Sequence, residues 1–226
     1  INRVQDNYVV QWGDPNGEDQ AKARRLPDGL AVVPQNDYHA IIRETLESSR
    51  RSVTSRLANG PLGRDAYALV TGYHLGWPVA AEPIEHGVGR LWPVHCYGMV
   101  GVGRDMPPNT GTGAELYTVI GHAPRHLDRN IALVGRVIEG IEHLSSLPRG
   151  TGALGFYETP EERTPIASVR IGTEVSGLPA YEYLSTESES FARYADARAN
   201  RRDAFFIRPA GGADVCNIPV PVRRVK

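Results

Sequence analysis

The feature that most limits the fold of this chain is its content of turn-forming residues. Twenty-four glycines and 17 prolines occur among 226 residues, well above the usual share of about 12% for the two together. Both residues interrupt helices and bend the chain between short strands. The composition therefore excludes a coiled coil or a plain helical bundle and favours a turn-rich β or mixed fold.

The charge of the chain is balanced, with 25 Lys and Arg against 26 Asp and Glu and a net charge of −1. A protein that binds nucleic acid or an anionic membrane by bulk charge carries an excess of positive residues. We therefore expect no nucleic-acid partner. No apolar run approaches the roughly 18 residues that a membrane-spanning helix needs, so we also expect no membrane span.

Short runs of strand-forming residues recur along the chain with turn signals between them. They cover residues 3–11, 97–102, 116–120, 131–138 and 166–171. Such a series is typical of a barrel or a sandwich. Residues 63–93 read as irregular, and the Gly- and Pro-rich end, 209–226, reads as an extended tail.

Three segments favour helices. The first covers 37–58, where apolar residues recur at helical spacing on one face: Tyr38, Ile42, Leu46, Val53 and Leu57. A short helix is expected over 139–147. A third is expected from the capping box at 186–189 to about residue 202.

The chemistry-bearing residues form none of the common metal or cofactor motifs. Gly101 and Gly103 lack the third glycine of a dinucleotide fingerprint, since Met106 stands at that position. His122 and His126 are four residues apart, but Pro124 between them argues against a helical metal-binding pair. We expect neither a metal nor a cofactor.

The two cysteines, Cys96 and Cys216, are far apart in the sequence. They are either two buried thiols or one long-range disulfide, and a disulfide would indicate an oxidising compartment.

One group near the start of the chain combines a cation, an amide and an aromatic ring: Arg3, Gln11 and Tyr8. Regular strand alternation would place Tyr8 on the opposite face from the other two, so a bend near Asp6 and Asn7 is needed to bring all three together. By themselves these residues favour a plain interpretation, with Arg3 as a surface charge and Gln11 as an ordinary polar side chain.

Two longer stretches of sequence favour a functional role for this group. NRVQDNYVVQWGDP at 2–15 resembles the first signature of the cyclophilins, in which Arg-Val is followed by an aromatic residue, an apolar residue, Gln and Gly-Asp. The segment from GMVGVGRDMPPNTG to VGRVIEGIEHL, at 98–144, resembles the second and third signatures of that family in order and spacing, and TPIASVRI at 164–171 resembles its closing strand. The chain thus resembles a divergent bacterial cyclophilin-type peptidyl-prolyl isomerase.

The resemblance implies a mainly β fold, a cyclophilin-like closed antiparallel β-barrel with capping helices. Residues 1–172 would form this domain, with an insertion over about 15–93, and 173–226 would be a C-terminal extension packed on the barrel. The catalytic arginine of the family follows two strands and a helix, whereas Arg3 is the third residue here. We therefore expect an N-terminal segment of the same protein that this chain does not include.

The resemblance also assigns roles to residues. Arg3 and Gln11 take the catalytic positions, with Arg3 donating a hydrogen bond to the prolyl nitrogen of a twisted amide. The implied substrate-binding residues are Tyr8, Val9, Gly103, Arg104, Glu115, Tyr117, His126, Leu127 and Ile131. His126, Ile131 and Arg104 replace the Trp, His and Asn of many cyclophilins, so weak cyclosporin binding is expected.

The expected function is the isomerisation of X–Pro bonds in proline-containing polypeptides, in support of protein folding. The alternative is a cyclophilin-like chaperone or protein-binding module with little isomerase activity, which would use the insertion and the C-terminal extension for a partner. Frequent export of bacterial members and the possible cysteine pair favour a periplasmic or secreted protein, with a cytoplasmic one as the alternative.

Overall fold

The structure, a computed structural model, describes residues 1–226 with the exception of 18, 20, 44–64, 84–87 and 226. Two compact units make up the chain. The first combines Ile1–Tyr38 with His95–Ser176, and the second combines His39–Val94 with Gly177–Lys226. The domain limits expected from the sequence, 1–172 and 173–226, stay a prediction.

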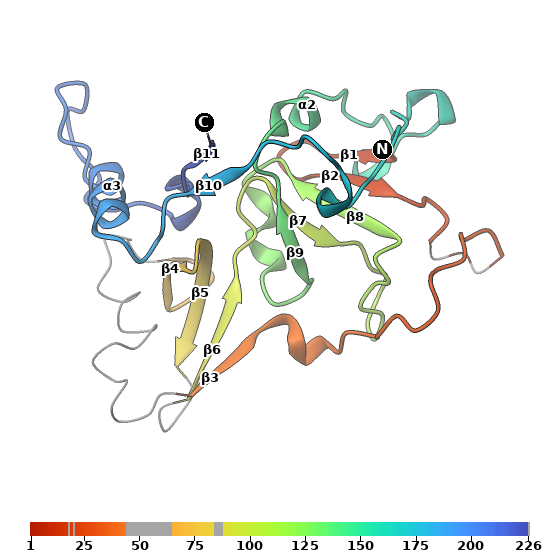
Figure 1. Cartoon of the computed structure of the whole chain (residues 1–226), viewed down its shortest axis with the longest axis horizontal. Coiled ribbons are helices and arrows are strands. Elements are labelled where there is room, and N and C mark those ends of the chain that lie inside the picture. The colour runs from red at the N-terminus through yellow and green to blue at the C-terminus, as the bar shows by residue number, and fades with distance from the viewer. Residues whose placement is uncertain (18, 20, 44–64, 84–87, 226) are drawn as a thin grey trace. The chain divides into compact units, whose positions relative to one another are not determined.

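The first unit is built on a five-stranded antiparallel sheet in the order β1-β2-β8-β7-β9 (Figure 1). Its strands are β1 (Arg3–Val4), β2 (Val9–Gly13), β7 (Met99–Val102), β8 (Glu115–Val119) and β9 (Leu133–Arg136). The strands expected over 97–102, 116–120 and 131–138 are confirmed: the first and third are shorter than expected, and the second is shifted by one residue.

The first expected strand is a hairpin. Instead of one bent strand over 3–11, β1 and β2 pair across a turn, with Arg3 opposite Gln11. Asn7 lies in this turn at a φ of 54°, a left-handed conformation that Asn adopts more readily than most residues. Because directly paired residues share a face of a sheet, the hairpin places Arg3 and Gln11 side by side.

A small apolar core lies against this sheet. Its buried members are Val4, Val10, Ile120 and Tyr157. Helix α2 (Ile141–Ser145) adds the half-buried Ile141 and Leu144 to this cluster. The helix expected over 139–147 is therefore confirmed in a shorter form. Short 3-10 turns complete the unit: η2 (Ala123–Leu127), η3 (Ala153–Gly155), η4 (Pro160–Glu162) and η5 (Gly172–Glu174).

The mainly β character is confirmed, but the closed barrel is wrong for the described residues. Closure needs hydrogen bonds between the first and last strands of the sheet, and β1 and β9 lie at its two ends with no pairing between them in the part of the chain described. The expected closing strand at 166–171 is also not a strand. Its apolar residues Ile166, Val169 and Ile171 are exposed, and the segment pairs with no strand in the described part of the chain.

The second unit contains a four-stranded antiparallel sheet in the order β3-β6-β5-β4. Its strands are β3 (Ala40–Arg43), β4 (Val70–His74), β5 (Trp77–Pro83) and β6 (Val88–Pro93). The expectation that residues 63–93 are irregular is therefore wrong. Leu75 and Gly76 connect β4 to β5 at φ angles of 48° and 83°, which matches the positive φ values of a tight hairpin turn.

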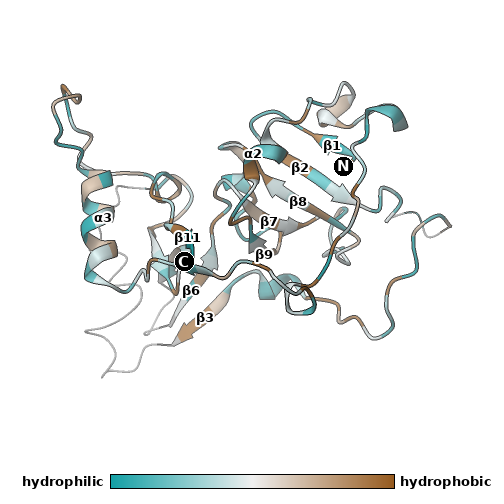
Figure 2. Ribbon diagram, turned by 45° about the horizontal axis from the view of Figure 1, so that its top comes forward, coloured by the Kyte–Doolittle hydropathy of each residue, from teal (hydrophilic) through white to brown (hydrophobic). Residues whose placement is uncertain are grey.

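The helix expected over 37–58 is wrong where the structure describes it. Residues Gln35–Tyr38 form the 3-10 turn η1, and the chain then enters β3, which pairs with β6. Ile41 and Ile42 are β-branched and suit a strand, and Figure 2 colours β3 as hydrophobic. The remaining part of this prediction, residues 44–58, lies outside the described residues.

The C-terminal part of the second unit combines a strand pair with a helix. The strand β10 (Tyr181–Tyr183) pairs with β11 (Val222–Arg224), so the expected extended tail contains a strand, as well as the turn η6 (Val215–Asn217). Helix α3 (Glu189–Ala199) is capped by Ser188, whose Oγ accepts from the Phe191 amide at 3.1 Å.

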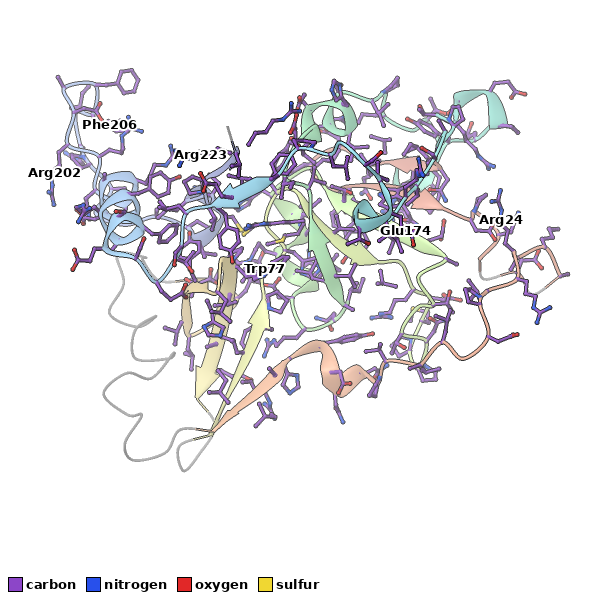
Figure 3. All side chains as sticks on the ribbon, viewed as in Figure 1. Arg24, Trp77, Glu174, Arg202, Phe206 and Arg223 are labelled. Carbon is purple, nitrogen blue, oxygen red and sulfur yellow. The ribbon has the colours of Figure 1, made fainter. Side chains whose placement is uncertain are left out.

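The helix predicted from the capping box is confirmed, with later onset and earlier end. Its buried Phe191, Ala195 and Ala199 form a core with Ile218. Figure 3 shows Arg202 and Phe206 on the loop that follows α3.

Candidate active site

The guanidinium of Arg3 is held by three acceptors. Its Nε donates to the backbone carbonyl of Leu154 at 2.8 Å, its Nη1 to Oε1 of Gln11 at 3.3 Å, and its Nη2 to Oε1 of Gln5. Arginine offers five N–H groups in a rigid plane, so bonds in three directions fix both the position and the orientation of that plane.

Two aromatic rings flank the same guanidinium. Its central carbon lies 5.5 Å from the ring centre of Tyr8 and 5.1 Å from that of Phe156, within the range of cation–π attraction. Burial lowers the pKa of Arg3, and the negative charge of Glu115 acts in the opposite direction. Burial also raises the pKa of the Tyr8 hydroxyl, an effect that the Arg3 charge reduces. Arg3 is thus a partly buried cation with a fixed geometry.

Glu115 orients the amide of Gln11. Nε2 of Gln11 donates to Oε2 of Glu115 at 3.0 Å, while Oε1 of Gln11 accepts from Arg3. The other carboxylate oxygen, Oε1, accepts from Nδ2 of the buried Asn2. Because a carboxylate only accepts, this contact determines which end of the Gln11 amide faces Arg3.

A buried hydrogen-bonded chain lies behind Tyr117. Nε2 of His95 is 2.8 Å from the Tyr117 hydroxyl, and Nδ1 of His95 is 2.9 Å from Oδ1 of Asp128. Oδ2 of Asp128 accepts from Nε of Arg125 at 3.1 Å. His95 and Arg125 are each 1% exposed, so the ion pair between Arg125 and Asp128 lies inside the protein. In a neutral imidazole, Nδ1 donates to the carboxylate and Nε2 accepts from Tyr117, which fixes the tyrosine ring.

His126 contacts Tyr8 on the outer side of the site. The two rings stack with centres 5.7 Å apart, and the Tyr8 hydroxyl is 3.4 Å from Nε2 of His126. Nδ1 of His126 donates to the Ala123 carbonyl at 2.7 Å, so Nε2 is the nitrogen that accepts from Tyr8. This contact restrains the Tyr8 ring at the edge of the site.

The side chain of Arg104 donates its hydrogen bonds to backbone carbonyls. Its Nε and Nη2 donate to the carbonyl of Asn130 at 3.0 and 2.9 Å, and its Nη1 donates to the carbonyl of Asp105 at 2.7 Å. The side chain therefore joins the end of β7 to the loop before β9.

These residues surround one cavity of about 420 Å³. Of the residues predicted for the site, all but His126 line it: Arg3, Tyr8, Val9, Gln11, Gly103, Arg104, Glu115, Tyr117, Leu127 and Ile131. His126 lies beside it, against Tyr8. The strands β1, β2, β7 and β8 and the loops at 127–131 bring these residues together. The roles assigned to them stay predictions.

Three further residues line the cavity and were not predicted: Asp105, Leu154 and Phe156. Leu154 also supplies the carbonyl that holds Nε of Arg3. The glycines at 150, 152 and 155 indicate a tight loop in the sequence, but no local signal shows that the loop returns to β1. The contact between this loop and β1 is visible only in the tertiary structure.

A larger cavity, of about 670 Å³, lies between the end of β2 and residues 163–169. Its lining includes Ile1, Trp12 and Ile166 and lacks the fixed cation and amide pair of the Arg3 cavity. The smaller cavity is therefore the better candidate for chemistry. Across the described residues, no three His, Cys, Asp or Glu side chains gather as a metal site requires.

Two further findings bear on the sequence-based expectations. Cys96 and Cys216 are both disulfide-bonded, so the reading as two buried thiols is wrong. In the described part of the chain, no helix has the length and apolar character to cross a membrane.

Comparisons with known proteins bear on the fold and the family of the chain. No curated protein sequence matches the chain. A crystal structure of the cyclophilin AquaCyp293 from Hirschia baltica matches with a TM-score of 0.65 and 22% sequence identity, over 99% of this chain and 75% of that one. At this identity the likeness supports a cyclophilin-like fold.

The comparison with protein families is more specific than the comparison of folds. The sequence profile of the family "cyclophilin type peptidyl-prolyl cis-trans isomerase/CLD" matches residues 1–171, a stretch that includes the Arg3 cavity and all its lining residues. The protein therefore belongs to the cyclophilin-type peptidyl-prolyl cis-trans isomerases, the enzymes that rotate the peptide bond before proline.

Proposed function

We propose that Arg3 accelerates this rotation by donating a hydrogen bond to the prolyl nitrogen. Rotation about a peptide bond meets a barrier of about 18–20 kcal/mol because it breaks amide resonance. In the twisted amide the prolyl nitrogen regains a lone pair, which a fixed donor stabilises and which both planar forms lack. The observation that carries the proposal is the guanidinium of Arg3, held in a defined plane at the cavity that Tyr8 and Leu127 also line.

The other cavity residues would hold the substrate while its carbonyl turns. Tyr8, Val9, Tyr117 and Leu127 supply the apolar and aromatic surface for the proline ring, and Ile131 extends it. Burial of this ring contributes about 1–2 kcal/mol, so the affinity for short peptides is weak. The backbone of Gly103 and Arg104 would support the chain of the substrate, and the reaction would need no covalent intermediate.

The test measures cis–trans exchange in a short Ala-Pro peptide by NMR, without a coupled protease. Arg3→Ala removes the donor, and loss of one such donor lowers kcat by about 100-fold. Arg3→Lys keeps the charge but loses the planar fork, and should recover only a small part of the rate. Arg170→Ala is the matched control, since Arg170 is exposed and does not line the cavity. Equal rates for wild type and Arg3→Ala would contradict the assigned role.

The substrates we propose are X–Pro segments in unfolded or flexible polypeptides, whose isomerisation limits folding. The enzyme should speed the slow phase of a proline-limited refolding reaction. A chaperone role independent of turnover is the second candidate, since Phe205 and Ile207 are exposed next to α3 in the second unit. Refolding assistance that survives Arg3→Ala would favour that candidate.

We further propose a periplasmic or secreted location, because both cysteines are disulfide-bonded and disulfides persist in oxidising compartments. Thiol trapping of the native protein tests this proposal, and two free thiols would contradict it.

Cyclosporin should inhibit weakly. His126 occupies the position of the family's tryptophan, and its Nε2 already contacts Tyr8. A sub-micromolar inhibition constant would overturn this expectation.

A further inference from the structure

Leu154 has a backbone conformation that is unusual for its type. Its φ is 56° and its ψ is 19°, and Gly155 follows at a φ of 77°. Leucine has a β-carbon that makes this left-handed region unfavourable by about 1–2 kcal/mol, whereas Gly and Asn adopt it readily. A leucine at this position therefore opposes local backbone preference, and its side chain or its carbonyl has another use.

The conformation is imposed by the loop around it. The Gly150 amide donates to the Val4 carbonyl at 2.9 Å, and the Tyr157 amide donates to the Asn2 carbonyl at 3.0 Å. Within the loop, the Gly152 amide donates to the carbonyl of Phe156 at 2.9 Å. Both sides of the loop are thus hydrogen-bonded to β1, the strand that carries Arg3, and to Asn2 just before it.

The carbonyl and the side chain of Leu154 indicate two different roles. Its carbonyl accepts from Nε of Arg3 at 2.8 Å, a role that any residue in this conformation fulfils through its backbone. The residue is 66% exposed and lines the cavity, as does Phe156, which is 39% exposed. Two exposed apolar residues that line the same cavity give it an apolar surface that a bound ligand can cover.

We propose that Leu154 and Phe156 form an apolar shelf that binds the side chain of an apolar residue adjacent to the proline in the substrate. The inference rests on the proposed function of the Arg3 cavity, and it deepens that function by naming a class of substrate. The shelf is continuous with the surface that holds the proline ring, because Leu154, Phe156, Tyr8 and Arg3 line the same cavity. A neighbouring apolar side chain would cover the exposed leucine, whereas a small polar one would leave it in water.

The chain contains its own control for this idea. Leu75 is followed by Gly76, as Leu154 is followed by Gly155, and its φ is 48°. The Leu75 side chain is 62% exposed, but it does not line the cavity. Leu154→Asn and Leu75→Asn therefore replace the same residue, at a similar positive φ and similar exposure, with the residue that such turns prefer before glycine.

The experiment compares the kcat/KM of peptides that carry Leu or Ser next to proline, on either side in turn. In the wild type, we expect the Leu peptide to be preferred by about 5- to 10-fold on one side, the scale of a partly covered apolar contact. In Leu154→Asn, this ratio should fall close to one. In Leu75→Asn, the ratio should equal that of the wild type. Thermal unfolding of both variants should show no loss of stability, since Asn-Gly suits both turns.

The outcomes separate this inference from the proposed function. Absence of catalysis by the wild type on every peptide would remove the proposed function itself. An active wild type with no preference for the Leu peptide on either side would overturn the shelf. A folded Leu154→Asn variant that keeps the wild-type ratio would also overturn the shelf. So would a variant that loses rate equally on all peptides, because the substitution would then act through Arg3 alone.

Discussion

The side chains around Arg3 take their orientation from hydrogen bonds within the protein. Gln11 donates to Glu115 and accepts from Arg3, so its amide has one preferred orientation before any peptide binds. Tyr117 has its hydroxyl directed to His95, so it offers the cavity its aromatic ring. Each contact gives a prediction at the scale of a single residue.

Glu115→Ala should lower kcat by roughly 2- to 10-fold, the value of about one ordinary hydrogen bond, because the Gln11 amide loses the acceptor that orients it. Glu115→Gln should recover most of the rate, since its carbonyl oxygen can accept from Gln11 in the same way. The measurement is NMR exchange on one peptide. Equal rates for Glu115→Ala and Glu115→Gln would show that orientation of Gln11 is not the cause.

Tyr117→Phe should reduce the free energy of unfolding by about 1–3 kcal/mol, because it leaves the buried Nε2 of His95 without its partner. The measurement is urea unfolding, with Tyr97→Phe as the control. Tyr97 is 51% exposed, and substitutions at such sites usually stay within about 0.5 kcal/mol. Equal stability of the two variants would mean that the bond to His95 contributes nothing.

At the scale of elements, the site depends on how closely two strands approach. Gly101 on β7 is paired with Tyr117 on β8, and a β-carbon at Gly101 would overlap the Tyr117 ring. The glycine is therefore required by the neighbouring side chain, since its φ is not among the positive ones.

Gly101→Ala should displace the Tyr117 ring and lower kcat/KM by about 10-fold or more, as misplacement of a binding group does. Gly135→Ala is the control in the same sheet. It lies on β9, and the nearest atom to a β-carbon there, on Val100, is 4.0 Å away. Equal activity of the two variants would contradict the requirement for close approach.

At the scale of the whole molecule, each unit contains a buried or half-buried tyrosine whose hydroxyl is hydrogen-bonded. Tyr117 contacts His95 in the first unit, and Tyr73 donates to the carbonyls of Val215 and Ile218 in the second. Burial raises the pKa of both hydroxyls well above the usual value.

This predicts a loss of stability at alkaline pH. An unfolded tyrosine releases its proton near pH ~10, while the folded one retains it. Above that pH the unfolded state binds fewer protons, so the free energy of unfolding falls as pH rises, by about 1.4 kcal/mol per pH unit for each tyrosine. Urea unfolding at about pH 9 and about pH 11, with tyrosinate absorbance as a second signal, measures this. A constant free energy of unfolding over that range would contradict it.

The sequence predicted some of these features because their signals are local. The capping box at 186–189 predicted α3, which Ser188 caps by accepting from the Phe191 amide, and the strand runs of the first unit have strand-forming residues of their own. It was wrong for β3, because the apolar spacing from Tyr38 onward fits a helix, whereas pairing with β6 favours the extended form. The barrel was also wrong, since closure depends on partners at both ends of the sheet.

The sequence alone singled out Arg3 as the proposed catalytic group, because Arg3, Tyr8 and Gln11 lie in one short motif that resembles a known family. Only the tertiary structure decided how that group is held. The β1–β2 hairpin, Glu115 from β8 and the carbonyl of Leu154 meet at Arg3 from positions up to 151 residues apart in the chain. Contacts over such separations depend on the packing of whole elements, which no local pattern of residues encodes.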